Sequence, residues 1–311
     1  MGSKNIYFDF VYLAKKHSDV IIQIIMGKWM IDEAKTAKTF REKIFNSSLA
    51  EFHDYYNSRS VFPNFKPLPG GCCWFIYDKH YDGETKCFTH VLNKVIERTI
   101  NMNTTDFVRF HLMESMYSKI QEKCSASLMD SISSMDPFLL KRNNKKFVDV
   151  SEVKTDEYNT PFIYVKDKKS KRMLCYVKEG IANNNHEYVN VKKVYFNSTG
   201  GAVDKETDNA VCTMCEIADA GTLVSDTFII VLKTFSDDKH LENLKNYING
   251  KFARFFLAMG KPSIHDTKRC WKYVPDMLDY SIEWSDEKLY EYFELSNEEV
   301  EAIENFVKAR D

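Results

Sequence analysis

The sequence predicts an α/β protein that contains part of a doubly wound sheet, then a mixed α+β region and a short helical end. Two apolar runs predict the sheet. Val20–Met26 is short, continuous and β-branched, which is typical of a strand buried on both faces. Residues 72–77 are also apolar and follow a loop rich in Pro and Gly, which is typical of a further strand.

The elements around these runs follow an alternating order. Residues 5–18 and 35–46 have the apolar spacing of helices, and Leu49–Tyr55 has the pattern of a strand. The order helix, strand, helix, strand, loop, strand suits the second half of a doubly wound sheet that ends in an antiparallel hairpin.

Beyond about residue 105 the pattern changes to short strands and basic turns. We expect a helix at 106–124, strands at 162–165, 173–177, 188–195 and 227–233, and a long helix at 237–260. Two short helices should begin at Ser285 and Ser296, the second with a capping box that includes Glu299. These changes predict three parts, at residues 1–105, 106–275 and 276–311.

Composition excludes some classes of protein. Of the 311 residues, 44% are hydrophobic, and no uninterrupted apolar run approaches the ~20 residues of a membrane span. Among the eight cysteines, only Cys212 and Cys215 have the two-residue gap of a metal or redox pair, and no second pair accompanies them. We therefore expect no metal site, buried free thiols and a cytoplasmic location.

Charge is divided unevenly along the chain, although the net charge is only −2. Residues 138–193 contain 13 Lys or Arg and 7 Asp or Glu, whereas residues 276–311 contain 3 and 12. This division suggests one face for a polyanion and a separate acidic face. The alternative is two solvated surfaces without a partner.

Residues 6–77 resemble the later part of the catalytic domain in gamma-class adenine-specific DNA methyltransferases, above all those of type IIG restriction–modification enzymes. The motifs that carry this resemblance are Ile6 to Ala14, Met26-Gly27-Lys28-Trp29, Phe40-Arg41, Asp54-Tyr55, Asn57-Ser58, Val61-Phe62-Pro63 and Gly70-Gly71. The carboxyl-terminal part resembles the end of the target-recognition region in the same enzymes. Its motifs are Asn243 to Arg254, Lys261, Trp271, Val274-Pro275 and Trp284 to Glu299.

Two motifs of that family are absent from this sequence. No Phe-x-Gly-x-Gly loop, which in the family holds S-adenosylmethionine, follows an early strand, and no Asn-Pro-Pro-Tyr or Asp-Pro-Pro-Tyr loop orients an adenine amino group. Methyl transfer by this chain alone is therefore not expected. The resemblance implies that a missing or partner half supplies the cofactor site. A nuclease site is not expected either, because no Glu-x-Lys follows Pro275-Asp276.

Phe62 is the candidate for stacking on an extruded base, because base-modifying enzymes hold the target base against an aromatic face. The resemblance gives this role to the Phe of the Val-Phe-Pro segment. The structural alternative is that Phe62 plugs the edge of the sheet beside Pro63.

Basic residues in the variable middle and after the long helix are the candidates for DNA contacts, since strand–turn–strand hairpins suit phosphate binding. The alternative is a solubilising hairpin tip. Residues 183–186 could read adenine edges or form a plain polar turn. The predicted DNA-binding residues are Lys141, Arg142, Lys145, Lys146, Lys168, Lys169, Lys171, Arg172, Lys261, Lys268 and Arg269.

The sequence thus predicts recognition of a specific double-stranded DNA site for an adenine-specific restriction–modification methyltransferase, without a complete catalytic site. A first alternative is one half of a split methyltransferase, which predicts an exposed apolar face where the missing strands belong. A second is a repurposed fragment that binds protein through its acidic end.

Overall fold

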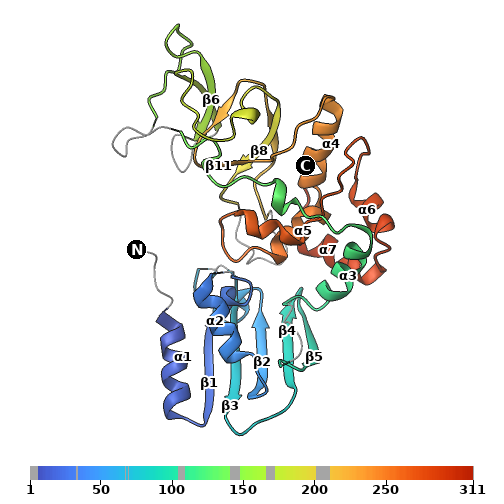
Figure 1. Ribbon diagram of the computed structural model, residues 1–311. Coiled ribbons are helices and arrows are strands. Elements are labelled where there is room, and N and C mark those ends of the chain that lie inside the picture. The colour runs from blue at the N-terminus through green and yellow to red at the C-terminus, as the bar shows by residue number, and fades with distance from the viewer. Residues whose placement is uncertain are drawn as a thin grey trace.

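The computed structural model describes residues 6–32, 34–66, 68, 70–103, 109–140, 148–165, 172–200 and 211–310. A five-stranded sheet occupies one end of the molecule, helices pack together in the middle, and two small sheets lie at the other end (Figure 1). The mixed α/β class predicted from the sequence is confirmed. No helix of the described part is long and apolar enough to cross a membrane.

The large sheet has the strand order β1-β3-β2-β4-β5. Strand β3 is antiparallel to both β1 and β2, so β1 and β2 are parallel to each other. Strand β4 pairs with β2 in parallel and with β5 in antiparallel. The strands are β1 (Val20–Met26), β2 (Leu49–Tyr55), β3 (Cys72–Asp78), β4 (Thr85–Val91) and β5 (Lys94–Ile100).

The hairpin of β4 and β5 is missing from the sequence-based prediction. Its turn residues, Leu92 and Asn93, have φ angles of 51° and 58°. Two consecutive positive φ angles are the signature of a tight hairpin turn, which usually carries Asn-Gly or Asp-Gly. With leucine at the first position, the usual sequence signal is lacking.

Two helices cover one face of the sheet. Helix α1 (Ile6–His17) buries Phe8 and Val11, and helix α2 (Lys35–Ile44) buries Phe40 among others. The rings of Phe8 and Phe40 stack with centroids 4.1 Å apart. These side chains share one core with Trp29 and with the inward residues of the strands. Both helices therefore lie on the same side of the sheet.

The helices in the middle of the molecule share a larger core. It joins α3 (Met113–Lys123), α4 (Asp238–Asn249), α5 (Lys251–Met259), α6 (Asp286–Tyr292) and α7 (Asn297–Phe306). Tyr56 and Val91, at the ends of β2 and β4, also belong to this core. The predicted boundary at residue 275 therefore falls inside a continuous core, and residues 276–310 are not a separate tail.

The single helix predicted at 237–260 is wrong, because the chain breaks into α4 and α5 at Gly250. The carboxylate of Asp286 accepts hydrogen bonds from the backbone N–H groups of Lys251 (2.8 Å) and Phe252 (2.9 Å). A Cβ atom at Gly250 would lie only 2.7 Å from that carboxylate. Asp286, which is distant in sequence, thus caps a second helix start that apolar periodicity does not reveal.

The two small sheets each contain three strands, in the orders β10-β6-β7 and β11-β8-β9. The strand predicted at 188–195 begins later, because His186–Tyr188 forms a 3₁₀ turn. The strand predicted at 227–233 is shorter in the structure. The strands are β6 (Thr160–Val165), β7 (Arg172–Val177), β8 (Lys193–Asn197), β9 (Glu216–Ala218), β10 (Leu223–Val224) and β11 (Phe228–Ile230).

Candidate nucleic-acid interface

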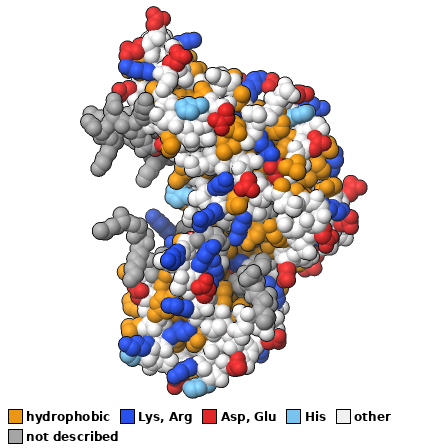
Figure 2. Space-filling view, in the orientation of Figure 1, with side chains coloured by type: hydrophobic (Ala, Val, Ile, Leu, Met, Phe, Trp, Pro, Cys, Tyr) orange, Lys and Arg blue, Asp and Glu red, His pale blue; other side chains and the backbone are white. Residues whose placement is uncertain are grey.

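A cleft of about 740 Å³ lies between the large sheet and the helical core. One wall is the segment that leaves the carboxyl end of β1, with Lys28 and Asp32; the other is the loop after α5 and the 3₁₀ helix Lys268–Tyr273. Figure 2 shows Lys and Arg side chains gathered where the two regions meet. Ligands of open α/β sheets bind outside the carboxyl ends of the strands, so the position of the cleft suits a binding site.

The basic groups of the cleft come from both walls. Lys28 is half-buried, whereas His265, Lys268 and Arg269 are exposed. The Nζ of Lys268 lies 4.0 Å from an oxygen of Asp130, and both side chains are open to solvent. Water screens such an exposed pair, so the positive charge of Lys268 remains available to an anion. Lys268 and Arg269 are thus exposed side chains of the cleft, and their contact with DNA stays a prediction.

Lys28 is positioned by the motif residues around it. Trp29 is fully buried against Phe40, with ring centroids 4.9 Å apart. The guanidinium of Arg41 donates hydrogen bonds to the carbonyl oxygens of Trp29 (2.6 Å) and Asp32 (2.7 Å). These contacts hold the 3₁₀ turn Gly27–Met30 between β1 and α2, so Trp29, Phe40 and Arg41 have structural roles.

The loop that follows β2 carries Phe62, and a hydrogen bond links two of its described residues. The hydroxyl oxygen of Ser58 accepts a hydrogen bond from the N–H of Leu68 at 2.9 Å. At its far end, Gly71 accepts from the N–H of Gly27 at 2.9 Å, and a Cβ atom at Gly70 would lie 2.8 Å from Lys28 Cα. The loop therefore packs directly against the wall of the cleft.

Phe62 is half-buried and contacts the exposed Phe65 edge to face, with centroids 6.1 Å apart. Phe62 N–H donates to the carbonyl of Ser58 at 2.8 Å, which places the ring just after the 3₁₀ turn Ser58–Ser60. The ring is therefore partly open to solvent at the carboxyl end of β2. Its role in base stacking stays a prediction.

A buried ion pair lies beneath this loop. The guanidinium of Arg109 donates to the two carboxylate oxygens of Asp54 at 2.6 and 2.7 Å, and it lies 4.0 Å from the ring centre of Tyr56. Burial alone lowers the pKa of Arg109, but the Asp54 carboxylate more than offsets this and holds that pKa above its ordinary value. Because a Cβ at Gly71 would lie 3.0 Å from Arg109, the pair supports the base of the loop.

Lys261 is withdrawn from the predicted DNA contacts. Its side chain is fully buried, and its Nζ lies 2.8 Å from the equally buried carboxylate of Asp266. Burial raises the pKa of the Asp266 carboxyl to about 6, although Lys261 acts to lower it. An ammonium group enclosed in this way cannot reach a phosphate. Lys261 and Asp266 are five positions apart in the sequence. This spacing does not show whether the two side chains pair inside the protein or lie in an exposed cluster.

Most of the basic middle lies outside the described residues, namely Lys141, Arg142, Lys145, Lys146, Lys168, Lys169 and Lys171. Arg172 is described and is engaged within the protein. It forms an ion pair with Glu216, donates to the carbonyl of Met214 at 2.7 Å and lies over the ring of Tyr195. These contacts stabilise the packing of β7 on β8 and β9.

Two further sequence features are structural. The side-chain amides of Asn184 and Asn185 donate to the carbonyl of Pro137 at 3.2 and 2.6 Å, which favours the polar-turn interpretation over base reading. Cys212 and Cys215 are buried free thiols. Within the described ranges, no three His, Cys, Asp or Glu side chains converge as metal ligands would.

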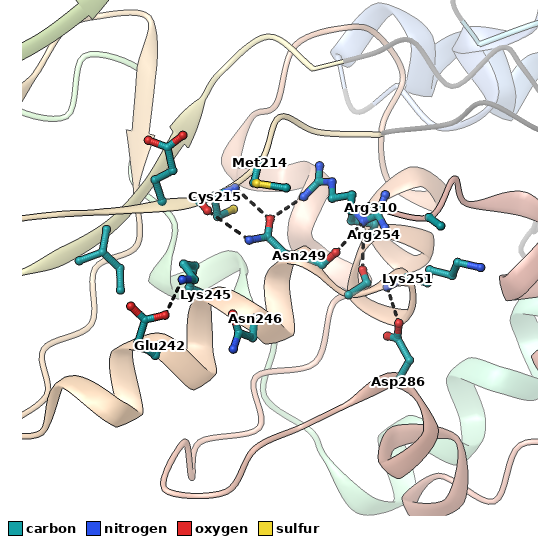
Figure 3. A pocket seen from close by; sticks show the side chains of 14 residues that line it. Met214, Cys215, Glu242, Lys245, Asn246, Asn249, Lys251, Arg254, Asp286 and Arg310 are labelled. Carbon is teal, nitrogen blue, oxygen red and sulfur yellow. Dashed lines mark hydrogen bonds and ion pairs between the residues drawn. The ribbon is translucent and has the colours of Figure 1, made fainter. Parts of the chain in front are cut away.

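A second cavity, of about 770 Å³, opens beside the break between α4 and α5 (Figure 3). Its cations already have partners within the protein. Lys245 pairs with Glu242, Lys251 pairs with Glu304 at 2.5 Å, and Arg310 donates to the side chain of Asn249 at 2.5 Å. These cations therefore hold neighbouring parts of the protein together, and the cavity does not present them to an anion from solution.

No family model matches the chain. Over 151 residues, which are 44% of this chain and 36% of the relative, it is 25% identical to an uncharacterized adenine-specific methylase of Mycoplasma pneumoniae. Among solved structures it is similar to the type IIG restriction endonuclease BpuSI, with a TM-score of 0.36 and 12% identity over 99% of this chain and 50% of that one. The chain thus spans about a third of the length of the curated relative it matches.

Proposed function

We propose that this chain is the DNA-reading part of an adenine-specific DNA methyltransferase of the restriction–modification type. The observation that carries the proposal is the basic cleft at the carboxyl end of the sheet, between two regions that could hold a duplex from both sides. Partial similarity to an adenine-specific methylase supports the choice of DNA among polyanions. In this proposal, S-adenosylmethionine binds to another α/β unit.

Within the cleft, the proposed roles divide by chemistry. Lys28, Lys268 and Arg269 contact phosphates and position the duplex, because ammonium and guanidinium groups neutralise the backbone without reading sequence. Phe62 is the proposed surface for an extruded base, since its ring is partly open and lies on a loop that packs against Lys28. Base reading falls, in this proposal, to residues 138–193.

The test is binding of the purified chain to a pool of random duplexes at two salt concentrations. Because released counterions drive phosphate binding, affinity should fall steeply as salt rises. Sequencing of the retained duplexes should reveal an enriched motif. Lys28→Glu and the double change Lys268→Glu/Arg269→Glu should each weaken binding about tenfold or more and reduce the salt dependence.

The matched control for Lys28→Glu is Lys239→Glu, which makes the same charge change on an exposed lysine of α4 outside the cleft. It should bind DNA like the unchanged chain. If the cleft variants also bind normally, the cleft is not the interface. If the unchanged chain does not bind at low salt, the proposal that it reads DNA by itself is wrong.

The alternative of a protein-binding fragment finds less support. Three carboxylates of the acidic end form ion pairs with lysines of the helical core, although only that of Glu299 is buried. Glu299 pairs with Lys119 at 2.7 Å, Glu304 pairs with Lys251 at 2.5 Å, and Glu294 pairs with Lys123. These pairs attach α7 and the turn before it to α3 and α5.

A further inference from the structure

Phe65 is the most exposed aromatic side chain of the described residues. It is 69% exposed, whereas Phe62 in the same loop is half-buried. The two rings meet edge to face with centroids 6.1 Å apart, so Phe62 covers part of Phe65 and leaves most of that ring in solvent. An exposed ring on a surface loop is a candidate for contact with another molecule, because loops carry many of the binding residues of proteins.

Hydrogen bonds to Ser58 hold the chain on both sides of Phe65. Ser58 is buried, and its carbonyl oxygen accepts from the N–H of Phe62 at 2.8 Å. Its hydroxyl oxygen accepts from the N–H of Leu68 at 2.9 Å. Between these two points, the N–H of Phe65 donates to the carbonyl of Phe62 at 3.2 Å. The exposed ring is therefore presented by a turn with defined hydrogen bonds, and such preorganisation lowers the entropy lost on binding.

Cations accompany the ring in the same loop. Arg59 and Lys66 are exposed, and the N–H of Arg59 donates to the side-chain oxygen of Asn57 at 3.0 Å. Residues 57–66 contain no Asp or Glu, so this segment carries only positive charge. We call residues 59–66 the Phe65 loop. An aromatic ring between cations suits a nucleic acid, whose bases stack on aromatic faces and whose phosphates attract Lys and Arg.

The Phe65 loop lies at the same edge of the sheet as the basic cleft. Strands β1 and β2 are parallel, so the turn that carries Lys28 and the loop that carries Phe65 both follow carboxyl ends. The two segments touch, because the N–H of Gly27 donates to the carbonyl of Gly71 at 2.9 Å. A duplex held between Lys28 and Lys268 would therefore run beside the Phe65 loop.

We propose that the ring of Phe65 inserts into the base stack of double-stranded DNA, while Arg59 and Lys66 contact the flanking phosphates. Apolar side chains that enter a duplex partly unstack one base step and bend the DNA. The inference rests on the proposed function, because the cleft has to hold the duplex. It does not depend on the role of Phe62, since insertion at one step requires no base to leave the duplex.

The test compares two short duplexes of one sequence, one intact and one with a single abasic site, for binding to the purified full chain at low salt. An abasic site removes part of the stacking that insertion must break, so the chain should bind that duplex about tenfold more tightly. Phe65→Ala should bind both duplexes alike. Phe65→Trp should retain the preference, and the abasic duplex should quench its fluorescence more than that of the unchanged chain, because an indole stacked on bases emits less.

The matched control is Phe10→Ala, which makes the same change at a phenylalanine of α1 that is 61% exposed and should keep the preference. Arg59→Gln/Lys66→Gln should weaken binding to both duplexes and reduce its salt dependence. Circular dichroism checks that the variants fold.

Equal binding of the two duplexes by the unchanged chain, or a preference that survives in Phe65→Ala, would overturn the insertion of Phe65 and leave DNA binding by the cleft intact. If neither duplex binds, the proposed function fails as well, so the two failures are distinguishable. Vesicles of anionic lipid serve as a further probe. If they bind the unchanged chain but not Phe65→Ala, while both duplexes bind alike, the Phe65 loop contacts a membrane surface instead of DNA.

Discussion

The large sheet and the helical core both bury apolar side chains, but they differ in how much apolar surface they leave exposed. In the helical core, Asp237, Ser285, Asp286 and Ser296 cap helix starts, and apolar residues of all five helices lie in one interior. In the sheet, one face is covered by α1 and α2, while the edge of β1 and the outer side of α1 remain apolar and exposed. The difference shows that the helical core encloses its apolar side chains, whereas the large sheet leaves apolar side chains of β1 and α1 exposed.

The largest expected effect on the free energy of unfolding comes from breaking the Asp54–Arg109 ion pair, the joint between the large sheet and the helical core. Arg109→Met leaves the Asp54 carboxylate buried without its partner, and such a loss costs about 3–5 kcal/mol of the free energy of unfolding. Urea unfolding measures the change. Arg59→Met, at an exposed arginine of the same loop region, should cost little. Equal stability of the two variants would show that the ion pair does not hold the joint.

A change of about 3 kcal/mol in the free energy of unfolding is expected at Lys193, a buried lysine in strand β8 of the small sheets. Its ammonium donates to the carbonyl of Thr222 at 2.9 Å, and burial lowers its pKa from 10.5 to about 8. Because the folded pKa lies below the unfolded one, the unfolded chain binds more protons between these values. Stability should therefore rise as pH increases from about 8 to 10.5, by about 1.4 kcal/mol per pKa unit.

Lys193→Met should remove this rise and increase the free energy of unfolding at pH 7, measured by urea titrations at several pH values. Lys192→Met, at the exposed neighbour that pairs with Asp238, is the control and should keep the rise. A Lys193→Met protein that still gains stability above pH 8 would contradict the assignment. The comparison measures how far one buried ammonium group destabilises the region of the two small sheets.

The smallest expected effect is the loss of a helix cap. It is tested by making the same change, Ser to Ala, once in the helical core and once beside the large sheet. Ser296 accepts a hydrogen bond from Glu299 N–H in the capping box of α7, so Ser296→Ala should cost about 1 kcal/mol. Ser18→Ala, in the exposed connection between α1 and β1, should change the free energy of unfolding by less than about 0.5 kcal/mol. Thermal unfolding of both variants tests whether the helical core depends on its caps.

Much of the fold could be predicted because local patterns dominate these elements. The β-branched run of β1, the helical spacing of α2 and the capping box of α7 are each contained within a few neighbouring residues. The hairpin of β4 and β5 could not be predicted in this way. Its turn lacks glycine, and its parallel pairing with β2 depends on residues more than 30 positions away.

The candidate site was predicted in part. Lys268 and Arg269 lie in the cleft, but Lys28 entered the sequence analysis only as a motif residue. Lys261 carried the same sequence signal as its neighbours, since a basic cluster does not reveal which side chain points inward. Its enclosure depends on Asp266 and on contacts with Val211, fifty positions earlier in the chain.

By itself, the sequence determined where many of the strands and helices lie, which faces are apolar and which segment is basic, because these properties follow from the order of neighbouring residues. Tertiary structure alone decided the placement of β3 between β1 and β2, the break at Gly250 and the cleft that joins Lys28 to Lys268 and Arg269. Each of these depends on contacts between residues far apart in the chain, where packing and buried charge outweigh local preference.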